Sequence, residues 1–576
     1  MRNGKILNKK FFQFLLPAVL SSMAISLNEF VDSIVVANLI DSDAMSLVNI
    51  ASPLLIAFAV IFTLLGVGGS TIYAGFLGSH EEEKADRAFS VTMFAGILIS
   101  LAILVLGSLF SGSIAAWMCK APEYRPMFLP YCRVLIISVI FIIPLQVIIH
   151  FLPALGRPGI GTLINVIANV INLLMDYVYI RFFSMGITGA AWATLTGYVA
   201  GFAAVFILCA AKKMRLPFSK ISLRDTGLLA QAASVGIGPA ANQIGYCIKI
   251  AFSNGLALSL AGMAGVTIFS VCMQAVSMVS VFISGVIDAM VPIGASLYGQ
   301  RDFSGIRILL KTVTWIQFAS NMAFFRFFEL RPQGILALYN IQPDMAGLGT
   351  IGIRIFSIMF VFRGFTLIYM YYFPLIGRRT YAFLISLVDG LIGIVPLAII
   401  LTKLFGINGL WMAYALLSIL LLGAILAANF VISARSGGKY SRLLLLENEE
   451  EKIPVYDCTI HMDPQQISAL AETIQNFCLQ EKIEGPLAAL TALSVEEMSM
   501  YTLEQSKGLG IDYLDMLMKI YPEYVLLDFR SIGRPFDVSA VPEEYSNMQV
   551  LREVVSSMEY NYVLGMNQTR LRVKAG

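Results

Sequence analysis

The sequence predicts an all-α polytopic membrane protein that ends in a small soluble α/β domain, and three observations indicate this. The chain has 576 residues, of which 57% are hydrophobic and only 13% charged, and its mean hydropathy is +0.77. That composition excludes a soluble globular or a disordered protein. Apolar runs of membrane-spanning length recur from Phe11 to Ile432. From Glu450 onward there are roughly 19 acidic and 10 basic residues, so about −9 of charge lies in the last segment and about +12 in the rest.

Apolar segments predict twelve transmembrane helices. The N-terminal stretch MRNGKILNKK is basic and precedes an apolar run without a clear cleavage site, so we expect that run to be a retained first helix. The seven cysteines are scattered and show no zinc or disulfide spacing. The predicted spans are 11–39, 46–76, 89–118, 127–153, 160–183, 187–211, 227–259, 262–297, 309–328, 346–376, 380–403 and 407–433.

Basic residues in alternate loops predict the orientation. The connection AKKMRLPFSKISLRD between the sixth and seventh spans contains five Lys and Arg residues, and the GRRT loop and the SARSGGKYSR exit are basic too. Loops rich in Lys and Arg stay in the cytoplasm. We therefore expect a multi-pass protein of the cell membrane with both termini in the cytoplasm.

Short features recur at one offset and predict an internal repeat. Pro17 matches Pro239 at a separation of 222 residues, and Gly78 matches Gly299 at 221. Gly156 of GRPG matches Gly377 of GRRT at 221, and Gly186 matches Gly406 at 220. Four matches in order indicate two six-helix lobes with the same orientation, which enclose a cavity between them. The expected domains are residues 1–220, residues 221–433, a linker at 434–452 and a soluble domain at 453–576.

The first lobe has two intramembrane carboxylates that the repeat does not duplicate. Asp32 corresponds to Asn254, and Asp176 falls near Pro396. A charge at bilayer depth is costly and marks function by default. Two neighbouring carboxylates can share a proton or hold a cation such as Na⁺. Asn172, four residues before Asp176, and Thr194 on the next helix add oxygen donors; alternatively, these groups only hydrogen-bond between helices.

Other polar residues have weaker predicted roles. Glu29 is either a neighbour of the cation site or part of a cavity wall. Five charged residues of the second lobe line the cavity, recognise a charged substrate or pair with one another, and pairing is the preferred interpretation for each alone. They are Lys249, Asp288, Arg354, Arg363 and Asp389. His150 ends a span and is interpreted as a satisfied interhelical group.

Residues 8–433 resemble the multidrug and toxic compound extrusion (MATE) family. The resemblance rests on Pro17 and Asp32 with VDSIVVAN, on GVGGST and GFLG, on ALGRPG, on NLLMDYVYI and on MGITGAAWAT. It implies a twelve-helix, two-lobe antiporter that exports cationic or amphipathic compounds against H⁺ or Na⁺. It also implies a cation site at Asp32, Asn172, Asp176 and Thr194, and it matches a family tyrosine to Tyr131.

The chain departs from the family pattern in two places. Ala37 replaces a glycine that the family commonly has soon after the first-helix aspartate, and the loop IDSDA is unusually acidic. The acidic residues that one branch carries in its second lobe have no secure match, which favours a resemblance to the DNA-damage-inducible branch. The coupling ion and the substrate stay open.

The C-terminal segment predicts a mixed α/β domain. Strands are expected at VYDCTIHM, 512–520, EYVLLDFRS, MEYNYVLGMN and TRLRVK. Helices are expected at 464–482, with Asp463 as N-cap and Pro464 at the first position, at 486–506 and near 546–557. This order resembles the ATP-binding fold of histidine kinases and anti-sigma-factor kinases.

The expected nucleotide site of this domain is degenerate. Glu497 is retained, but Tyr501 stands where the family has a metal-binding Asn. Ser531 replaces the adenine-reading Asp two residues before Gly533. We therefore expect neither catalysis nor ATP binding. The acidic surface fits either a regulatory protein or the basic loops of the membrane part.

The leading hypothesis is a secondary exporter that works by alternating access, is not an enzyme, and needs no cofactor beyond H⁺ or Na⁺. No Walker motif is present, because GVGGST lacks the lysine. Its expected partners are a small-molecule substrate and the lipid bilayer, and nucleic acid is not among them. One alternative is a flippase of lipid-linked oligosaccharides from the same broad superfamily. Another is a membrane sensor with a kinase-like domain.

Overall fold

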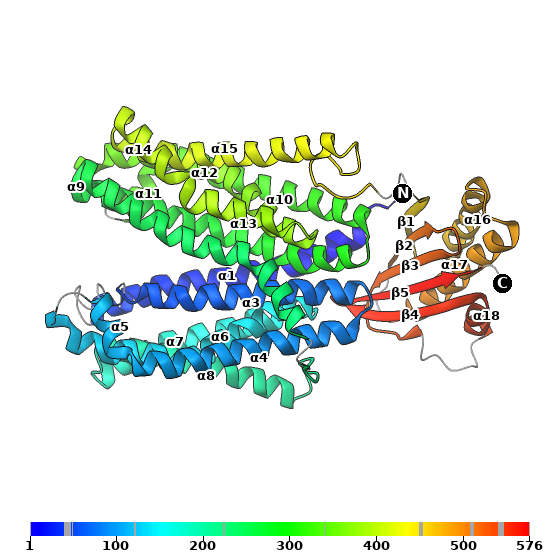
Figure 1. Ribbon diagram of the computed structural model, residues 1–576, viewed down its shortest axis with the longest axis horizontal. Helices are drawn as coiled ribbons and strands as arrows, with labels where there is room; N and C mark the ends of the chain where they lie inside the picture. The colour runs from blue at the N-terminus through cyan, green and yellow to red at the C-terminus, as the bar shows by residue number, and fades with distance from the viewer. Residues whose placement is uncertain are drawn as a thin grey trace.

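The computed structural model describes residues 2–39, 48, 50–119, 122–222, 225–339, 341, 343–448, 453–506, 512–538 and 546–574. For residues 28–39, 338, 343–344, 391, 506, 546–548 and 550 it describes the backbone alone. Two groups of helices lie side by side along the long axis of the molecule (Figure 1). A small sheet with its own helices lies at one end of both groups.

The first group of helices is formed by the first 210 residues. Its long helices are α1 (Lys5–Leu39), α3 (Ser52–Gly78), α4 (Glu82–Leu109), α6 (Arg125–Ala154), α7 (Pro158–Tyr177) and α8 (Ile187–Ala210). The short helix α5 (Ser111–Met118) and the turn η1 (Pro122–Tyr124) connect α4 to α6. After α7 the chain continues as one π-helical segment, η2 (Val178–Phe182).

The second group begins with α9 (Thr226–Gly299), which contains two spans. Ala261 and Gly262 leave the helical conformation inside it, and Gly262 has a positive φ of 59°. The break lies where the sequence predicts one span to end and the next to begin. The remaining elements are α10 (Phe303–Leu330), α11 (Pro332–Leu338), α12 (Pro343–Leu375), α13 (Arg379–Leu387), η4 (Val388–Ile392), α14 (Ile394–Phe405) and α15 (Ile407–Arg435).

The span count agrees with the sequence. Among the described residues, ten helical stretches are long and apolar enough to cross a membrane, and one of them is the whole of α9. Counting α9 as two spans gives eleven; α10 is not among the ten, and with its 28 residues it is the twelfth by length alone. Large apolar side chains on the outside of these helices, such as Leu109, Phe206 and Leu404, are exposed. An apolar exterior is what a lipid environment requires.

The repeat is visible in the backbone of its matched glycines. Gly156 and Gly377 have φ values of 75° and 76°. Gly186 and Gly406 have φ/ψ values of 54°/−144° and 58°/−142°. Positive φ favours glycine at all four positions. The two lobes therefore make the same turns at the same places.

The two lobes touch closely where α3 and α9 end. A Cβ on Gly78 would lie 2.1 Å from the Ser296 carbonyl oxygen, and a Cβ on Gly299 would lie 2.0 Å from the Gly75 oxygen. Both pairs join positions that the repeat relates, because Gly75 and Ser296 are 221 residues apart, as are Gly78 and Gly299. Only glycine permits this approach of two backbones, so this end of the lobes is closed.

The C-terminal domain is a five-stranded antiparallel sheet with helices on one face. Its elements are β1 (Val455–His461), α16 (Pro464–Gln480), α17 (Gly485–Ser506), β2 (Tyr513–Ile520), β3 (Val525–Ile532), α18 (Ser546–Val554), β4 (Val555–Val563) and β5 (Met566–Val573). The strand order is β1-β2-β3-β5-β4. One face of the sheet buries Met516, Met518 and Leu527 in a core with α16 and α17, and the other faces the helix bundle (Figure 1).

Asp463 stands at the N-cap of α16 with Pro464 at its start, as predicted, although the Asp463 side chain makes no capping hydrogen bond. Two local predictions in this domain need correction. The strand predicted across MEYNYVLGMN ends at Val563, because Leu564 and Gly565 have positive φ and turn the chain into β5. The helix predicted near 546–557 ends at Val554, because β4 begins at Val555.

Candidate functional site

Asn172 and Asp176 lie together on α7 in the first lobe. Asp176 is fully buried and Asn172 is 8% exposed, and the π-helical segment begins two residues after Asp176. π-Helical turns inside α-helices often mark functional sites. Helix α8 packs closely here, because a Cβ on Gly197 would lie 2.8 Å from the Asn172 Cβ. The structure thus encloses a carboxylate and an amide at bilayer depth.

The other residues predicted around this site have different surroundings. Thr194 on α8 is half-buried, and its hydroxyl donates to the Ala190 carbonyl oxygen at 3.1 Å. Tyr131 is buried in an apolar cluster with Phe128 and Leu135 and does not line the cavity described next. The side chains of Asp32 and Glu29 lie outside the described residues, although α1 carries both positions.

A cavity of ≈ 140 Å³ lies between the lobes. Helices α1, α3, α6 and α7 line it from the first lobe, and α9 and α12 line it from the second. Its polar lining consists of Ser21, Ser22, Ser70, Gln146, His150, Thr162, Asn165, Asp288 and Tyr371. Several of these are satisfied locally: His150 Nδ1 lies 2.7 Å from the Gln146 carbonyl oxygen, and Asn165 Nδ2 donates to Ser21 Oγ at 2.8 Å.

Among the described residues that line this cavity, Asp288 is the acidic one. It is on the second span of α9, and its side chain is exposed although the neighbouring residues Ile287 and Ala289 are buried. That exposure is toward the cavity, since Asp288 is part of the lining. The sequence left three roles open for Asp288, and the structure places it in the lining of the cavity. A carboxylate in a largely apolar cavity favours a cationic ligand.

Three of the other charged residues in the second lobe pair with one another, as the sequence analysis favoured. Lys249 Nζ lies 3.2 Å from Asp389 Oδ1, and Arg363 Nη1 lies 3.8 Å from Asp389 Oδ2. Lys249 also donates to the Asp389 carbonyl oxygen at 3.0 Å. Gly245 and Gly390 bring the backbones of α9 and η4 together beside this cluster. Arg354 lies 3.8 Å from Glu329 on α10.

The Lys249–Asp389–Arg363 cluster predicts a stability effect. Replacing Lys249 with Met leaves Asp389 without its nearest cation, and breaking a buried ion pair from one side costs about 3–5 kcal/mol. We expect a lower midpoint of thermal unfolding in detergent for Lys249→Met. We expect the double variant Lys249→Met/Asp389→Asn to recover part of that loss. Additive losses in the double variant would contradict the pairing.

In the C-terminal domain, aromatic residues fill the region of the expected nucleotide site. The Tyr501 ring lies 6.1 Å from the Phe536 ring, and the Phe536 amide donates to the Tyr560 hydroxyl at 3.1 Å. The Gly533 carbonyl oxygen accepts from the Tyr562 hydroxyl at 3.0 Å. Ser531 is buried in β3. Burial and Glu496 raise the pKa of Glu497. The absence of nucleotide binding remains a prediction.

No group of three or more His, Cys, Asp or Glu side chains that could hold a metal ion occurs in the part of the chain that the structure describes. That part lacks the Asp32 side chain, so the predicted Na⁺ site at Asp32, Asn172, Asp176 and Thr194 remains a hypothesis. Sequence reasoning did not find the polar cavity residues Gln146, Thr162 and Asn165. Each is a single polar residue in an apolar helix, which is an ordinary feature of packed membrane helices.

Comparison with known proteins gives consistent matches. The MatE family model matches residues 17–178. The multidrug export protein MepA of Staphylococcus haemolyticus is 22% identical over 448 residues, which cover 77% of this chain and 97% of that protein. MepA of Staphylococcus aureus strain MSSA476 is 23% identical over 412 residues, which cover 70% of this chain and 88% of that protein.

Solved structures agree with the fold. An outward-facing multidrug resistance MATE transporter of the MOP superfamily aligns with a TM-score of 0.68 at 21% identity, over 74% of this chain and 96% of that one. A MOP superfamily transporter from Pyrococcus furiosus aligns with a TM-score of 0.68 at 21% identity, over 75% of this chain and 97% of that one. The fold and these matches are similar to those of multi-pass membrane transporters. The predicted resemblance to the MATE family is confirmed by the MatE match and by these relatives and structures.

Proposed function

We propose that this protein is a secondary active exporter of cationic or amphipathic drugs or metabolites, driven by inward movement of H⁺ or Na⁺. The observation that carries the proposal is the buried carboxylate of Asp176 beside Asn172, which the second lobe does not duplicate. A buried carboxylate strongly favours a bound proton or cation. The relatives from Staphylococcus are multidrug export proteins, which supports the same substrate class.

The proposed mechanism is alternating access across the central cavity. An external proton or Na⁺ binds at Asp176 and at Asp32, neutralises the site and repacks α1 against α7. These helices also line the cavity, through Ser21 on α1 and Asn165 on α7, so binding of the ion changes the shape of the substrate site. Ion entry and substrate release are coupled in this way.

The Lys- and Arg-rich loops support a plasma-membrane orientation with the domain end in the cytoplasm. Lys212, Arg301 and Arg378 lie in turns between helices, and Arg301 contacts the domain through its carbonyl oxygen. Basic loops favour the cytoplasmic side. In this orientation substrate enters from the domain end and leaves at the opposite end.

Reconstitution in proteoliposomes tests the proposal. A pH gradient and a sodium gradient are applied separately, and one of them is expected to drive accumulation of cationic dyes from a panel. The gradient that drives accumulation identifies the coupling ion as H⁺ or Na⁺. If neither gradient moves any dye while the protein translocates a lipid-linked oligosaccharide, the exporter assignment is wrong.

Asp288 predicts substrate selectivity. In Asp288→Asn we expect the apparent affinity for monocationic dyes to fall roughly tenfold, because a charge-assisted contact of about 1.4 kcal/mol is lost. Affinity for uncharged amphipathic dyes should stay the same. Glu329→Gln is the matched control, because Glu329 is a carboxylate outside the cavity lining that contacts Arg354. Equal losses for charged and neutral dyes would exclude a role in charge recognition.

A further inference from the structure

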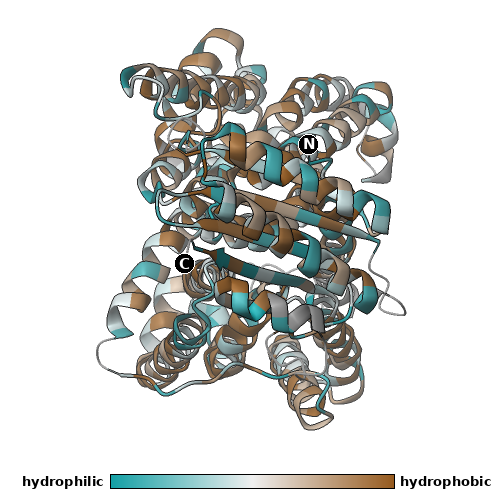
Figure 2. Cartoon of the chain, turned by 90° about the vertical axis from the view of Figure 1, so that its right-hand side faces the viewer, coloured by the Kyte–Doolittle hydropathy of each residue, from teal (hydrophilic) through white to brown (hydrophobic). Residues whose placement is uncertain are grey.

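The C-terminal domain contacts both lobes of the transporter at the same end. In the first lobe, the N-terminal Arg2 binds Asp515 of β2. The Asn561 amide of β4 lies within hydrogen-bonding distance of the α3–α4 turn in either amide orientation. In the second lobe, Lys519 donates to the Arg301 carbonyl oxygen at 2.8 Å. Seen from this end, the domain lies across the middle of the bundle (Figure 2).

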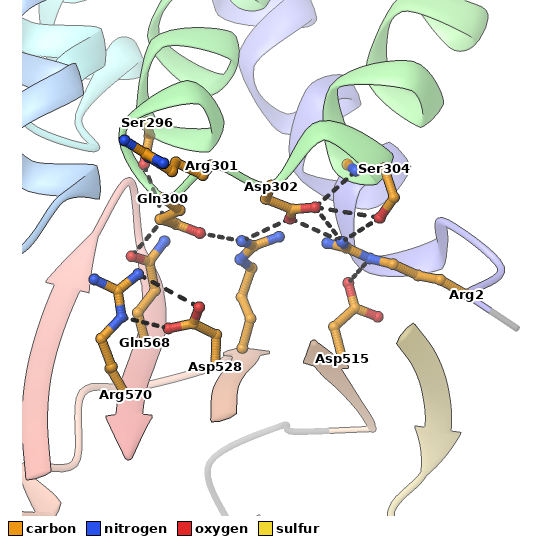
Figure 3. A network of polar contacts seen from close by, with 12 residues as sticks. Arg2, Ser296, Gln300, Arg301, Asp302, Ser304, Asp515, Asp528, Gln568 and Arg570 are labelled. Carbon is orange, nitrogen blue, oxygen red and sulfur yellow. Dashed lines mark hydrogen bonds and ion pairs between the residues drawn. The ribbon is translucent and has the colours of Figure 1, made fainter. Parts of the chain in front are cut away.

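A buried charge network connects these parts (Figure 3). Asp302, in the turn between α9 and α10, is fully buried. It accepts from Arg2 Nη1 at 2.8 Å and from Arg530 Nη2 at 3.1 Å. Gln300 Nε2 donates to Gln568 Oε1 at 2.8 Å, and Arg530 also donates to Gln300.

The ionisation of Asp302 follows from these contacts. Burial alone would raise the pKa of Asp302, but Arg2 and Arg530 together hold it well below its usual range. The carboxylate is therefore charged at every physiological pH. Its two arginines come from the N-terminus and from the C-terminal domain, and the pair with Arg530 exists only while the domain is docked.

The hairpin between β4 and β5 enters the bundle (Figure 1). Val563, Leu564 and Met566 are each about 1% exposed and belong to the same apolar core as the transmembrane helices. The Leu564–Gly565 turn packs against Gly156, where a Cβ would lie 2.9 Å from the Gly565 nitrogen. A Cβ on Gly565 would lie 2.6 Å from Lys10 Nζ.

This hairpin tip lies beside the central cavity. Lys10 is one turn before Phe14 on α1, and its Nζ lies 5.1 Å from the centre of the Phe14 ring, which lines the cavity. Gly156 is between Pro153 and Pro158, which both line the cavity. The tip therefore stands at the end of the cavity that faces the domain.

We propose that the C-terminal domain is a gate: when docked, it holds the domain-side ends of the two lobes together and closes that mouth of the cavity with its β4–β5 hairpin. This inference rests on the proposed alternating access, in which the lobes must separate at the domain side to admit substrate. The docked domain opposes that separation, because one rigid sheet binds both lobes. Undocking is thus a required step of each transport cycle or the point at which a regulator acts.

A charge swap in the full-length protein tests the gate. Asp302→Arg places three arginines in one buried site, so we expect the domain to undock. Asp302→Arg/Arg530→Asp restores a pair of opposite charges, so we expect the domain to dock again. Both variants lose the hydrogen bond from the Gly305 amide to the Asp302 carboxylate, so the double variant also controls for that loss. Arg570→Gln is the matched control, because Arg570 pairs with Asp528 inside the domain.

Two readouts that do not depend on transport are measured in each variant. Spin labels at Glu484 of the domain and Lys213 of the bundle, both exposed, report docking through their distance distribution. A cysteine at Ser22, in the cavity lining, reports opening through its rate of reaction with a membrane-impermeant maleimide added from the domain side. The parent chain with its native cysteines sets the background.

We expect the labelling rate at position 22 to rise at least fivefold in Asp302→Arg, to return toward the parent rate in the charge swap, and to stay unchanged in Arg570→Gln. The inference fails if the domain moves away and the labelling rate does not rise. It fails equally if the domain stays docked with three arginines in the site, or if labelling rises while the domain is docked. Since labelling needs no substrate, these outcomes are independent of whether the protein exports drugs.

Discussion

Asp176→Asn is expected to reduce ion-coupled transport to the background level while the protein remains folded. The carboxylate is fully buried, and a charged group at bilayer depth costs about 2.5–3.5 kcal/mol on insertion scales. An amide of the same shape removes that cost, but it takes up no proton and carries no negative charge to hold a cation. The midpoint of thermal unfolding should therefore stay the same or rise.

The combination of lost transport and retained stability separates a coupling role from a structural one. If Asp176 only formed hydrogen bonds between helices, Asp176→Asn would change stability with little effect on the rate of export. The measurement is gradient-driven dye accumulation in proteoliposomes together with the unfolding temperature in detergent. Glu329→Gln serves again as the control, and Asp32→Asn should behave as Asp176→Asn does. Export at the parent rate by both aspartate variants would refute the proposed coupling site.

Much of the fold follows from short-range sequence information. Span length and loop charge depend on local composition, so the twelve spans and the break at Gly262 are predictable. The repeated glycines are predictable too, because positive φ at Gly156 and Gly377 restricts the residue type. The strand that was predicted to run past Val563 shows the limit of this approach. The residues VLGMN are apolar enough for a strand, and the left-handed turn at Leu564 has no strong local signal.

The arrangement of the charged residues was only partly predictable. Four-residue spacing places Asn172 and Asp176 on one face of α7, and both are buried. Lys249, Arg363 and Asp389 come from three separate elements, so their pairing depends on tertiary packing at Gly245 and Gly390. The network around Asp302 joins residues 2, 302 and 530. No pattern within one segment encodes such a contact; the acidic composition of the domain indicated only that it could bind basic partners.

Alanine at both Gly78 and Gly299 is expected to keep the domain-side ends of the lobes apart and to reduce transport at least tenfold. The Cβ atoms would lie 2.1 and 2.0 Å from the Ser296 and Gly75 carbonyl oxygens. Carbon–oxygen contacts normally begin near 3.3 Å, so α3 and α9 must separate by roughly 1 Å or more. The closed state of this end, which the proposed export cycle requires after substrate has entered, becomes the less stable one.

The measurement combines dye export with the labelling rate of a cysteine at Ser22 from the domain side. In Gly78→Ala/Gly299→Ala, labelling should stay near the parent rate while the network around Asp302 is intact, because the hairpin of the docked domain still closes the mouth of the cavity. Gly75→Ala is the matched control: a Cβ there meets only the Ala295 carbonyl oxygen, at 3.8 Å. Labelling that rises in the double variant while the domain stays docked would mean that the crossing of α3 and α9, and not the hairpin, is the barrier on this side. That result would contradict the gate.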